Sequence, residues 1–174
     1  MKIFALLFCF LIVFTGAEAR IITVGESGDY LELRQAADNA VPGDTIYILN
    51  GVYDGGILIE NLRGEPGRRI TITGPQNESS NVIFDGGSNA VHFVNPSYLN
   101  IMFLRFRGQT GNGINIDDGG DYSSPAHHIL IDNCVWLEMD ASGNNDELKL
   151  SGLDDFVISN CSFSNGAAGG SMID

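Results

Sequence analysis

The hydrophobic and polar positions of this chain alternate in short runs separated by glycine-rich and asparagine-rich turns. Three of these runs share the pattern apolar-x-Ile-x-Asn-Cys-x-aromatic or a close variant, and the copies begin 30 and 27 residues apart. They are Leu99–Phe106, Ile129–Trp136 and Phe156–Phe163. Alternation with a period of two is typical of β-strands, in which successive side chains point to opposite faces. The chain is therefore predicted to repeat a unit of short strands.

A second alternating segment follows each copy of the pattern. These segments are Ile114–Ile116, Leu148–Leu150 and Met172–Ile173, and Val91–Phe93 is an earlier member of the series. A unit of three short strands cannot bury its apolar face alone, but stacking one unit on the next produces a continuous core. We therefore expect an all-β solenoid of parallel strands.

The Asn-Cys step within the repeat fits such a solenoid. Each coil needs sharp bends between its strands, and asparagine tolerates the left-handed backbone conformation that makes them. Cys134 and Cys161 are then expected to lie one above the other, facing inward. Parallel side chains on stacked strands favour two free thiols packed in the core, and a disulfide bond between them is the alternative.

The N-terminal part has a different pattern. Residues 1–19 combine a basic start, an apolar run and a small-x-small site, which is typical of a secretory signal peptide. Residues 20–174 are then the β-helix domain, with an amphipathic cap helix over residues 30–41 and a first strand over Thr45–Leu49. Because the chain stops at a strand, we expect the domain to be incomplete at its C-terminus.

Charge excludes several classes of partner. The 174 residues include 9 basic and 22 acidic ones, for a formal net charge of −13. Non-specific binding to nucleic acid or to anionic lipid requires a basic surface, so neither partner is expected. The signal peptide predicts a secreted, extracellular or periplasmic protein, with no membrane insertion after cleavage. We expect the full-length protein to be a monomer.

The order of these features resembles the pectate-lyase-like superfamily of right-handed parallel β-helix proteins. The features are a signal peptide, a cap helix ending in Pro42-Gly43-Asp44, the segment Gly51-Val52-Tyr53 and coils containing Ile-x-Ile. The resemblance implies a right-handed, single-stranded parallel β-helix. It also implies a choice among lyases, hydrolases, esterases and non-catalytic surface proteins. Residues 145–152 look most like lyases that depend on calcium and carry a lysine base.

Alternation places three polar side chains in one outward column on successive coils. They are His92, Asn115 and Lys149. Lys149 is the only lysine after the predicted signal peptide, and it stands among carboxylates. We predict that Lys149 is the base that removes a proton from a uronic acid, and that His92 and Asn115 contact the sugar. The alternative is a surface lysine that pairs with Asp146 or Glu147, which would raise its pKa.

Four carboxylates flank this column in the two longest loops. Asp117, Asp118, Asp146 and Glu147 are the predicted ligands of a Ca²⁺ ion, because calcium prefers several hard oxygen ligands. Bound calcium would neutralise the carboxylate of the sugar and would let an acidic enzyme bind an acidic polymer. The alternative is an ordinary solvated acidic turn at Gly119-Gly120.

These features predict a secreted polysaccharide lyase that cleaves an acidic polysaccharide, such as pectate or alginate, by calcium-assisted β-elimination. Two alternatives stay open. One is a non-catalytic carbohydrate-binding or adhesion β-helix, and the other is a glycoside hydrolase on the same fold.

Overall fold

The computed structural model describes residues 18–76 and 81–174, and the predicted signal peptide falls almost entirely outside them. Within these residues the chain forms one short α-helix and many short β-strands. The helix and the strands of the first coils are β1 (Ile21–Val24), α1 (Leu33–Asn39), β2 (Thr45–Ile48), β3 (Gly51–Asp54), β4 (Ile57–Glu60), β5 (Ile70–Thr73), β6 (Val82–Asp85) and β7 (Val91–Val94). The later strands are β8 (Ser97–Met102), β9 (Arg105–Arg107), β10 (Ile114–Asp117), β11 (Ala126–Asp132), β12 (Val135–Trp136), β13 (Leu148–Ser151), β14 (Leu153–Ser159) and β15 (Ser162–Phe163).

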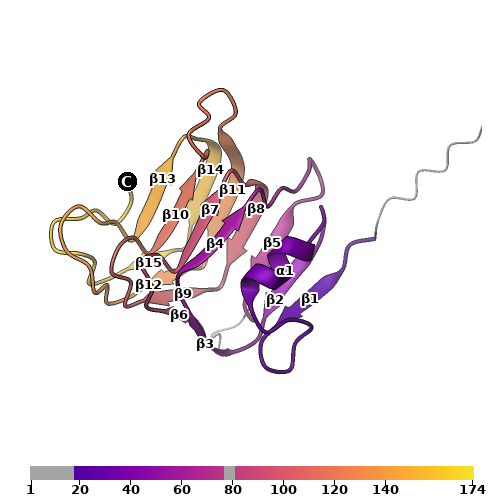
Figure 1. Cartoon of the computed structure of the whole chain (residues 1–174), viewed down its shortest axis with the longest axis horizontal. Helices are drawn as coiled ribbons and strands as arrows, with labels where there is room; N and C mark the ends of the chain where they lie inside the picture. The colour runs from indigo at the N-terminus through magenta and orange to yellow at the C-terminus, as the bar shows by residue number, and fades with distance from the viewer. Residues whose placement is uncertain (1–17, 77–80) are drawn as a thin grey trace, which may run out of the picture.

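The strands build three parallel sheets, as Figure 1 shows. The six-stranded sheet has the order β1-β2-β5-β8-β11-β14, the five-stranded sheet β15-β12-β9-β6-β3, and the four-stranded sheet β13-β10-β7-β4. Apart from β1 and β2, neighbours in each sheet are three strands apart in the chain, so each complete coil contributes one strand to each sheet. The predicted right-handed parallel β-helix is confirmed.

The core is made of ladders of like side chains, one from each coil. The isoleucines of the repeat stack in register in the six-stranded sheet, where Ile101 pairs with Ile72 and with Ile131. Aromatic rings stack in the five-stranded sheet, with centroids 5.9, 5.1 and 4.6 Å apart along Phe84, Phe106, Trp136 and Phe163. Because every coil buries the same positions, the sequence repeat becomes a continuous hydrophobic interior.

Left-handed residues make the bends between the six-stranded and five-stranded sheets. Asn133 and Asn160 have φ angles of 52° and 51°, and Phe103 has a φ of 54° at the equivalent position of the preceding coil. Asparagine adopts this conformation more readily than other non-glycine residues. The predicted role of the Asn-Cys step is therefore confirmed.

The two cysteines of the repeat are free thiols. Cys134 is fully buried, and Cys161 lies half-buried on the next coil and packs against the core. Burial raises the pKa of Cys134, whereas a hydrogen bond from Cys134 lowers the pKa of Cys161 to about 7. The favoured arrangement of stacked thiols is the one observed.

The N-terminal cap is shorter than the prediction of residues 30–41. Helix α1 covers only Leu33–Asn39, because Tyr30 pairs with Val24 in a parallel bridge and is held by backbone hydrogen bonds. Leu33, Ala36 and Ala37 form its buried face. The expectation that Thr45–Leu49 is the first strand is wrong, because β1 precedes the helix and pairs with β2. Helix α1 packs mainly against β1, β2 and β4.

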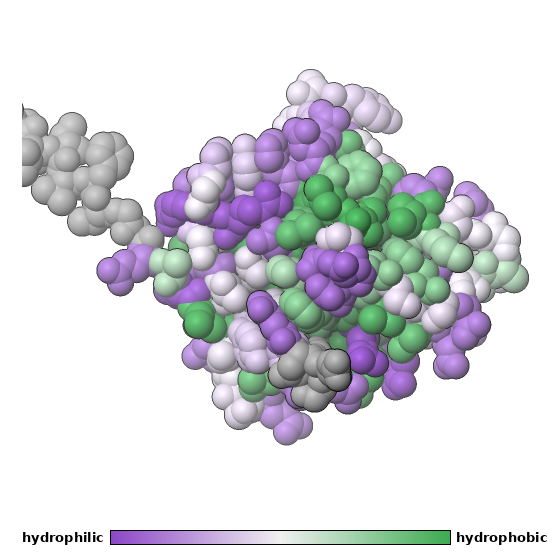
Figure 2. All heavy atoms as spheres, turned by 180° about the vertical axis from the view of Figure 1, so that it is seen from behind, coloured by the Kyte–Doolittle hydropathy of each residue, from purple (hydrophilic) through white to green (hydrophobic). Residues whose placement is uncertain are grey.

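The surface mixes polar and apolar side chains. Figure 2 shows hydrophobic side chains gathered in the middle of one face and hydrophilic ones around them. At the C-terminal coil four large apolar side chains are exposed, namely Phe156, Val157, Met172 and Ile173. No helix among the described residues has the length and apolar character needed to cross a membrane.

Candidate functional site

The outward face of the four-stranded sheet carries the predicted column of polar residues. His92 on β7 pairs in register with Asn115 on β10, and Asn115 pairs with Lys149 on β13. Their neighbours along each strand, such as Phe93 and Ile116, are buried in the core. Alternation therefore turns the three polar side chains outward, about 4.8 Å apart from one strand to the next. The structure brings these three predicted residues together.

An aspartate at the end of β10 contacts the two residues of this column that come first in the chain. Asp117 Oδ2 lies 2.6 Å from Nε2 of His92 and 3.4 Å from Nδ2 of Asn115. Both side chains of the closer pair are mostly buried, with 29% of His92 and 22% of Asp117 exposed. Asp117 therefore holds the imidazole of His92 in one orientation through Nε2, and this contact leaves Nδ1 unused.

Lys149 lies between two carboxylates at the other end of the column. Its Nζ atom is 3.2 Å from Oδ2 of Asp146 and also donates to Oδ2 of Asp174. These hydrogen bonds, first the one to Asp174 and then the one to Asp146, raise the pKa of Lys149 above its ordinary value. The side chain is consequently a stable ammonium group in the absence of substrate.

The predicted pair of calcium ligands on β10 separates in the structure. The chain does turn at Gly119 and Gly120, with φ angles of 69° and 82°. Asp117 nevertheless faces His92, whereas Asp118 is buried and accepts a hydrogen bond from the N–H of Gly120. Asp118 fills the space left open by Gly152, where a Cβ atom would lie 2.2 Å from its Oδ2 atom.

The other predicted pair also diverges. Asp146 accepts hydrogen bonds from the N–H of Ser171 and from Lys149, whereas Glu147 lies against Gly166. Burial raises the pKa of Glu147. Oδ2 of Asp118 and Oε1 of Glu147 have no hydrogen-bond partner among the described residues.

The spacing of the four predicted ligands decides whether they could form one calcium shell. Within residues 18–76 and 81–174, no three His, Cys, Asp or Glu side chains gather closely enough to hold a metal ion. The set Asp117, Asp118, Asp146 and Glu147 thus does not fit a single calcium shell in this conformation. Calcium binding stays a prediction from the sequence.

Two contacts on the outward face of the four-stranded sheet were not predicted from the sequence. The first is the pairing of Asp117 with His92, and the second is the contact of Asp174 with Lys149. The first had a signal, because Asp117 lies two residues after Asn115 and so shares its outward face. Asp174 follows a turn whose path cannot be deduced from alternation alone.

The wall therefore combines a positioned imidazole, an amide and an ammonium group in one line. An ammonium group can neutralise a sugar carboxylate, and an imidazole can accept a proton near neutral pH. Neutralisation of the carboxylate and acceptance of the proton are both needed to remove the acidic proton next to a uronate carboxylate.

Several solved structures are similar to this chain, and the first of them agrees with the fold. The alginate lyase from Paenibacillus sp. str. FPU-7 is 16% identical, with a TM-score of 0.51, and the match covers 88% of this chain and 74% of that one. A rhamnogalacturonan lyase is 13% identical, with a TM-score of 0.47 and coverage of 88% and 62%. The pectin methylesterase from Aspergillus niger is 15% identical, with a TM-score of 0.48 and coverage of 88% and 70%. No curated protein sequence matches this chain significantly.

A protein-family model gives the more specific result. The model described as Chondroitinase B matches residues 28–174, which include the cap helix, every complete coil and the polar wall. Because that match covers most of the sequence, the chain belongs to the chondroitinase B family.

Proposed function

We propose that this chain is part of an extracellular polysaccharide lyase that cleaves a uronic-acid polysaccharide by β-elimination on the wall of His92, Asn115 and Lys149. The observation that carries the proposal is the in-register column itself, in which the His92–Asp117 pair and Lys149 share one outward face. Family membership supports the reaction class, and the extracellular setting follows from the predicted signal peptide.

The geometry supports a division of roles along the column. Lys149 is held protonated by Asp146 and Asp174, so its ammonium group would pair with the uronate carboxylate and acidify the adjacent C5 proton. His92, oriented by Asp117, would take that proton. The C4–O bond would break as the C4–C5 double bond forms, and its electron pair would leave on the glycosidic oxygen, which takes a proton from water. Asn115, between them, would donate to a sugar oxygen. The sequence-based alternative makes Lys149 itself the base.

One set of variants separates these roles. Arginine keeps a positive charge but does not lose its proton in proteins, so Lys149→Arg preserves charge pairing and removes any function as a base. We expect Lys149→Arg to keep activity within about tenfold of the parent, and His92→Ala and Lys149→Ala to lose about 100-fold or more in kcat/KM. The assay measures ultraviolet absorbance of the unsaturated uronate on chondroitin, alginate and polygalacturonate.

Arg105→Ala serves as the matched control, since Arg105 lies on β9 in the five-stranded sheet, away from the column. If Lys149→Arg is as inactive as Lys149→Ala while His92→Ala retains activity, Lys149 is the base. If all these variants match the parent protein, the column does not carry the reaction.

Calcium dependence is a separate prediction with its own test. If the carboxylates rearrange to bind Ca²⁺ as the sequence predicted, calcium should raise the Tm and the double variant Asp118→Asn, Glu147→Gln should abolish that rise. Differential scanning fluorimetry with CaCl₂ or EGTA measures the effect. An unchanged Tm in the parent protein would show that this chain holds no calcium.

A further inference from the structure

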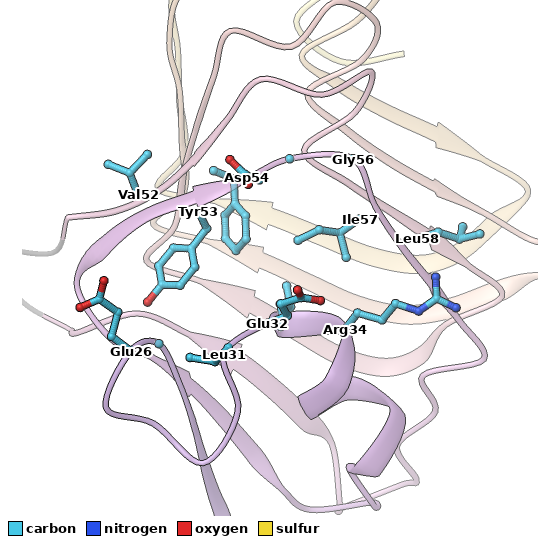
Figure 3. A pocket seen from close by; sticks show the side chains of 14 residues that line it. Glu26, Leu31, Glu32, Arg34, Val52, Tyr53, Asp54, Gly56, Ile57 and Leu58 are labelled. Carbon is cyan, nitrogen blue, oxygen red and sulfur yellow. The ribbon is translucent and has the colours of Figure 1, made fainter.

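The N-terminal end of the β-helix carries a cavity that the proposed reaction does not use. It has a volume of about 480 Å³ and lies between α1 with its preceding loop and the strands β3 and β4. Figure 3 shows Tyr53 pointing from β3 toward the loop of Glu26 and Leu31, while Ile57 and Leu58 continue along the cavity above Glu32 and Arg34.

The cavity exists because the cap covers only part of the first complete coil. Helix α1 packs mainly on β1, β2 and β4, so the corner at β3 is left without a cover. The apolar floor there is formed by Tyr53 and Phe84, whose ring centroids are 5.6 Å apart. Leu31, 67% exposed, stands at the edge.

Strand β3 also offers an unpaired backbone edge to this cavity. Among the described strands its only neighbour in the five-stranded sheet is β6, and the N–H groups of Gly51 and Gly55 donate to the chain beside that strand. Because backbone groups alternate along a strand, those of Val52 and Asp54 point to the opposite side. Within residues 18–76 and 81–174, no strand pairs with β3 on that side.

The charges around the cavity select among possible occupants. Glu26, Glu32 and Asp54 line it, and the single cation, Arg34, lies 3.8 Å from Asp38 on its own helix. Carboxylates repel a uronic-acid polymer and also a second copy of a chain with a net charge of −13. They attract lysine and arginine.

We propose that this corner binds an extended basic peptide segment of another protein, which adds a strand to the free edge of β3. The backbone of Val52 and Asp54 supplies the hydrogen bonds, Tyr53 and Phe84 receive an apolar side chain, and the carboxylates face the basic ones. Peptide binding here is independent of the proposed lyase activity and lies at a different place on the solenoid.

The test uses the full chain and a synthetic peptide of alternating lysine and valine, with binding measured by isothermal titration calorimetry. Three matched ligands are compared, namely this peptide, a glutamate-valine peptide of equal length and the lysine-valine peptide N-methylated at every residue. We expect binding of the first only, weakened about tenfold or more by Val52→Pro and unchanged by Val52→Thr. The proline removes the outward N–H without breaking the ladder to β6.

Increasing salt should also weaken the binding, because the attraction is partly between exposed charges. Equal binding of the N-methylated or the glutamate peptide would overturn the proposal, and so would no binding of the lysine peptide. Because the N-methylated peptide tests the edge with the parent protein, the result does not depend on the folding of Val52→Pro. Sedimentation showing a dimer that Val52→Pro dissociates would assign the corner to self-association instead.

Discussion

The free-energy cost of the left-handed backbone conformation at the coil bends depends on which side chain is present. Asn133 adopts a left-handed conformation and donates to the carboxylate of Asp132, its neighbour. Asn160, one coil on, does the same in conformation and donates to the same carboxylate. The bend thus joins backbone preference to a polar ladder along the solenoid axis.

Substitution of Asn133 separates these two contributions. We expect Asn133→Ala to lower the free energy of unfolding by about 1–2 kcal/mol, because alanine resists a positive φ. Asn133→Gly should cost less, since glycine adopts the conformation freely. Urea unfolding followed by circular dichroism measures both. Equal losses would mean that the side-chain hydrogen bond, and not the backbone, sets the cost.

Side-chain partners were the hardest feature to predict from the sequence. Alternation correctly turned His92, Asn115 and Lys149 outward, because it depends only on strand geometry. It could not decide whether Asp117 would face a metal ion or His92. That choice depends on how the chain leaves β10, where Asp118 turns inward against Gly152.

Sheets and the cap were predicted with different success for a related reason. The strands repeat, so each copy of the pattern supports the assignment of the next, and all three walls follow from one periodicity. The cap occurs once. Its helix lost residues at both ends of the predicted range because Tyr30 pairs with Val24 and Ala40 is already extended. Tertiary pairing there overrides the helical pattern.

The aromatic ladder of the five-stranded sheet offers a test of packing between coils. Trp136 is fully buried between Phe106 and Phe163. We expect Trp136→Ala to lower the free energy of unfolding by about 3–5 kcal/mol, because it leaves a cavity in the stack. Trp136→Phe should cost much less, since it keeps a ring and removes an indole N–H that has no hydrogen-bond partner among the residues that the structure describes.

Denaturant unfolding monitored at several wavelengths measures both variants. A small loss for Trp136→Ala would indicate that neighbouring coils close the gap, and would contradict a rigid ladder.

The folded solenoid as a whole should lose stability at acidic pH. Hydrogen bonds lower the pKa of Asp29, Asp121 and Asp132. Burial alone would raise the pKa of Asp44, but hydrogen bonds from Arg20 and Val41 outweigh it and lower that pKa as well. At these four aspartates the unfolded chain therefore takes up protons before the folded chain does as the pH falls.

We expect the Tm to fall as the pH decreases from about 5 through the lowered folded-state pKa values of these groups, after little change between about pH 5 and 7. Asp44→Asn should unfold more easily at pH 6, by about 1.5–3 kcal/mol, and should lose less stability on acidification. Scanning calorimetry across this range measures the slope. An identical slope in the variant would exclude Asp44 as a contributor.

The in-register pairing of successive coils has an evolutionary implication. Each coil presents the same inward side chains to the coil before and the coil after, as Ile72, Ile101 and Ile131 do. Duplication of one 27- to 30-residue unit would thus lengthen the rod by about 4.8 Å and create only one new seam, made of contacts that already exist elsewhere. Slippage during gene replication is a sufficient route to longer or shorter versions of this architecture.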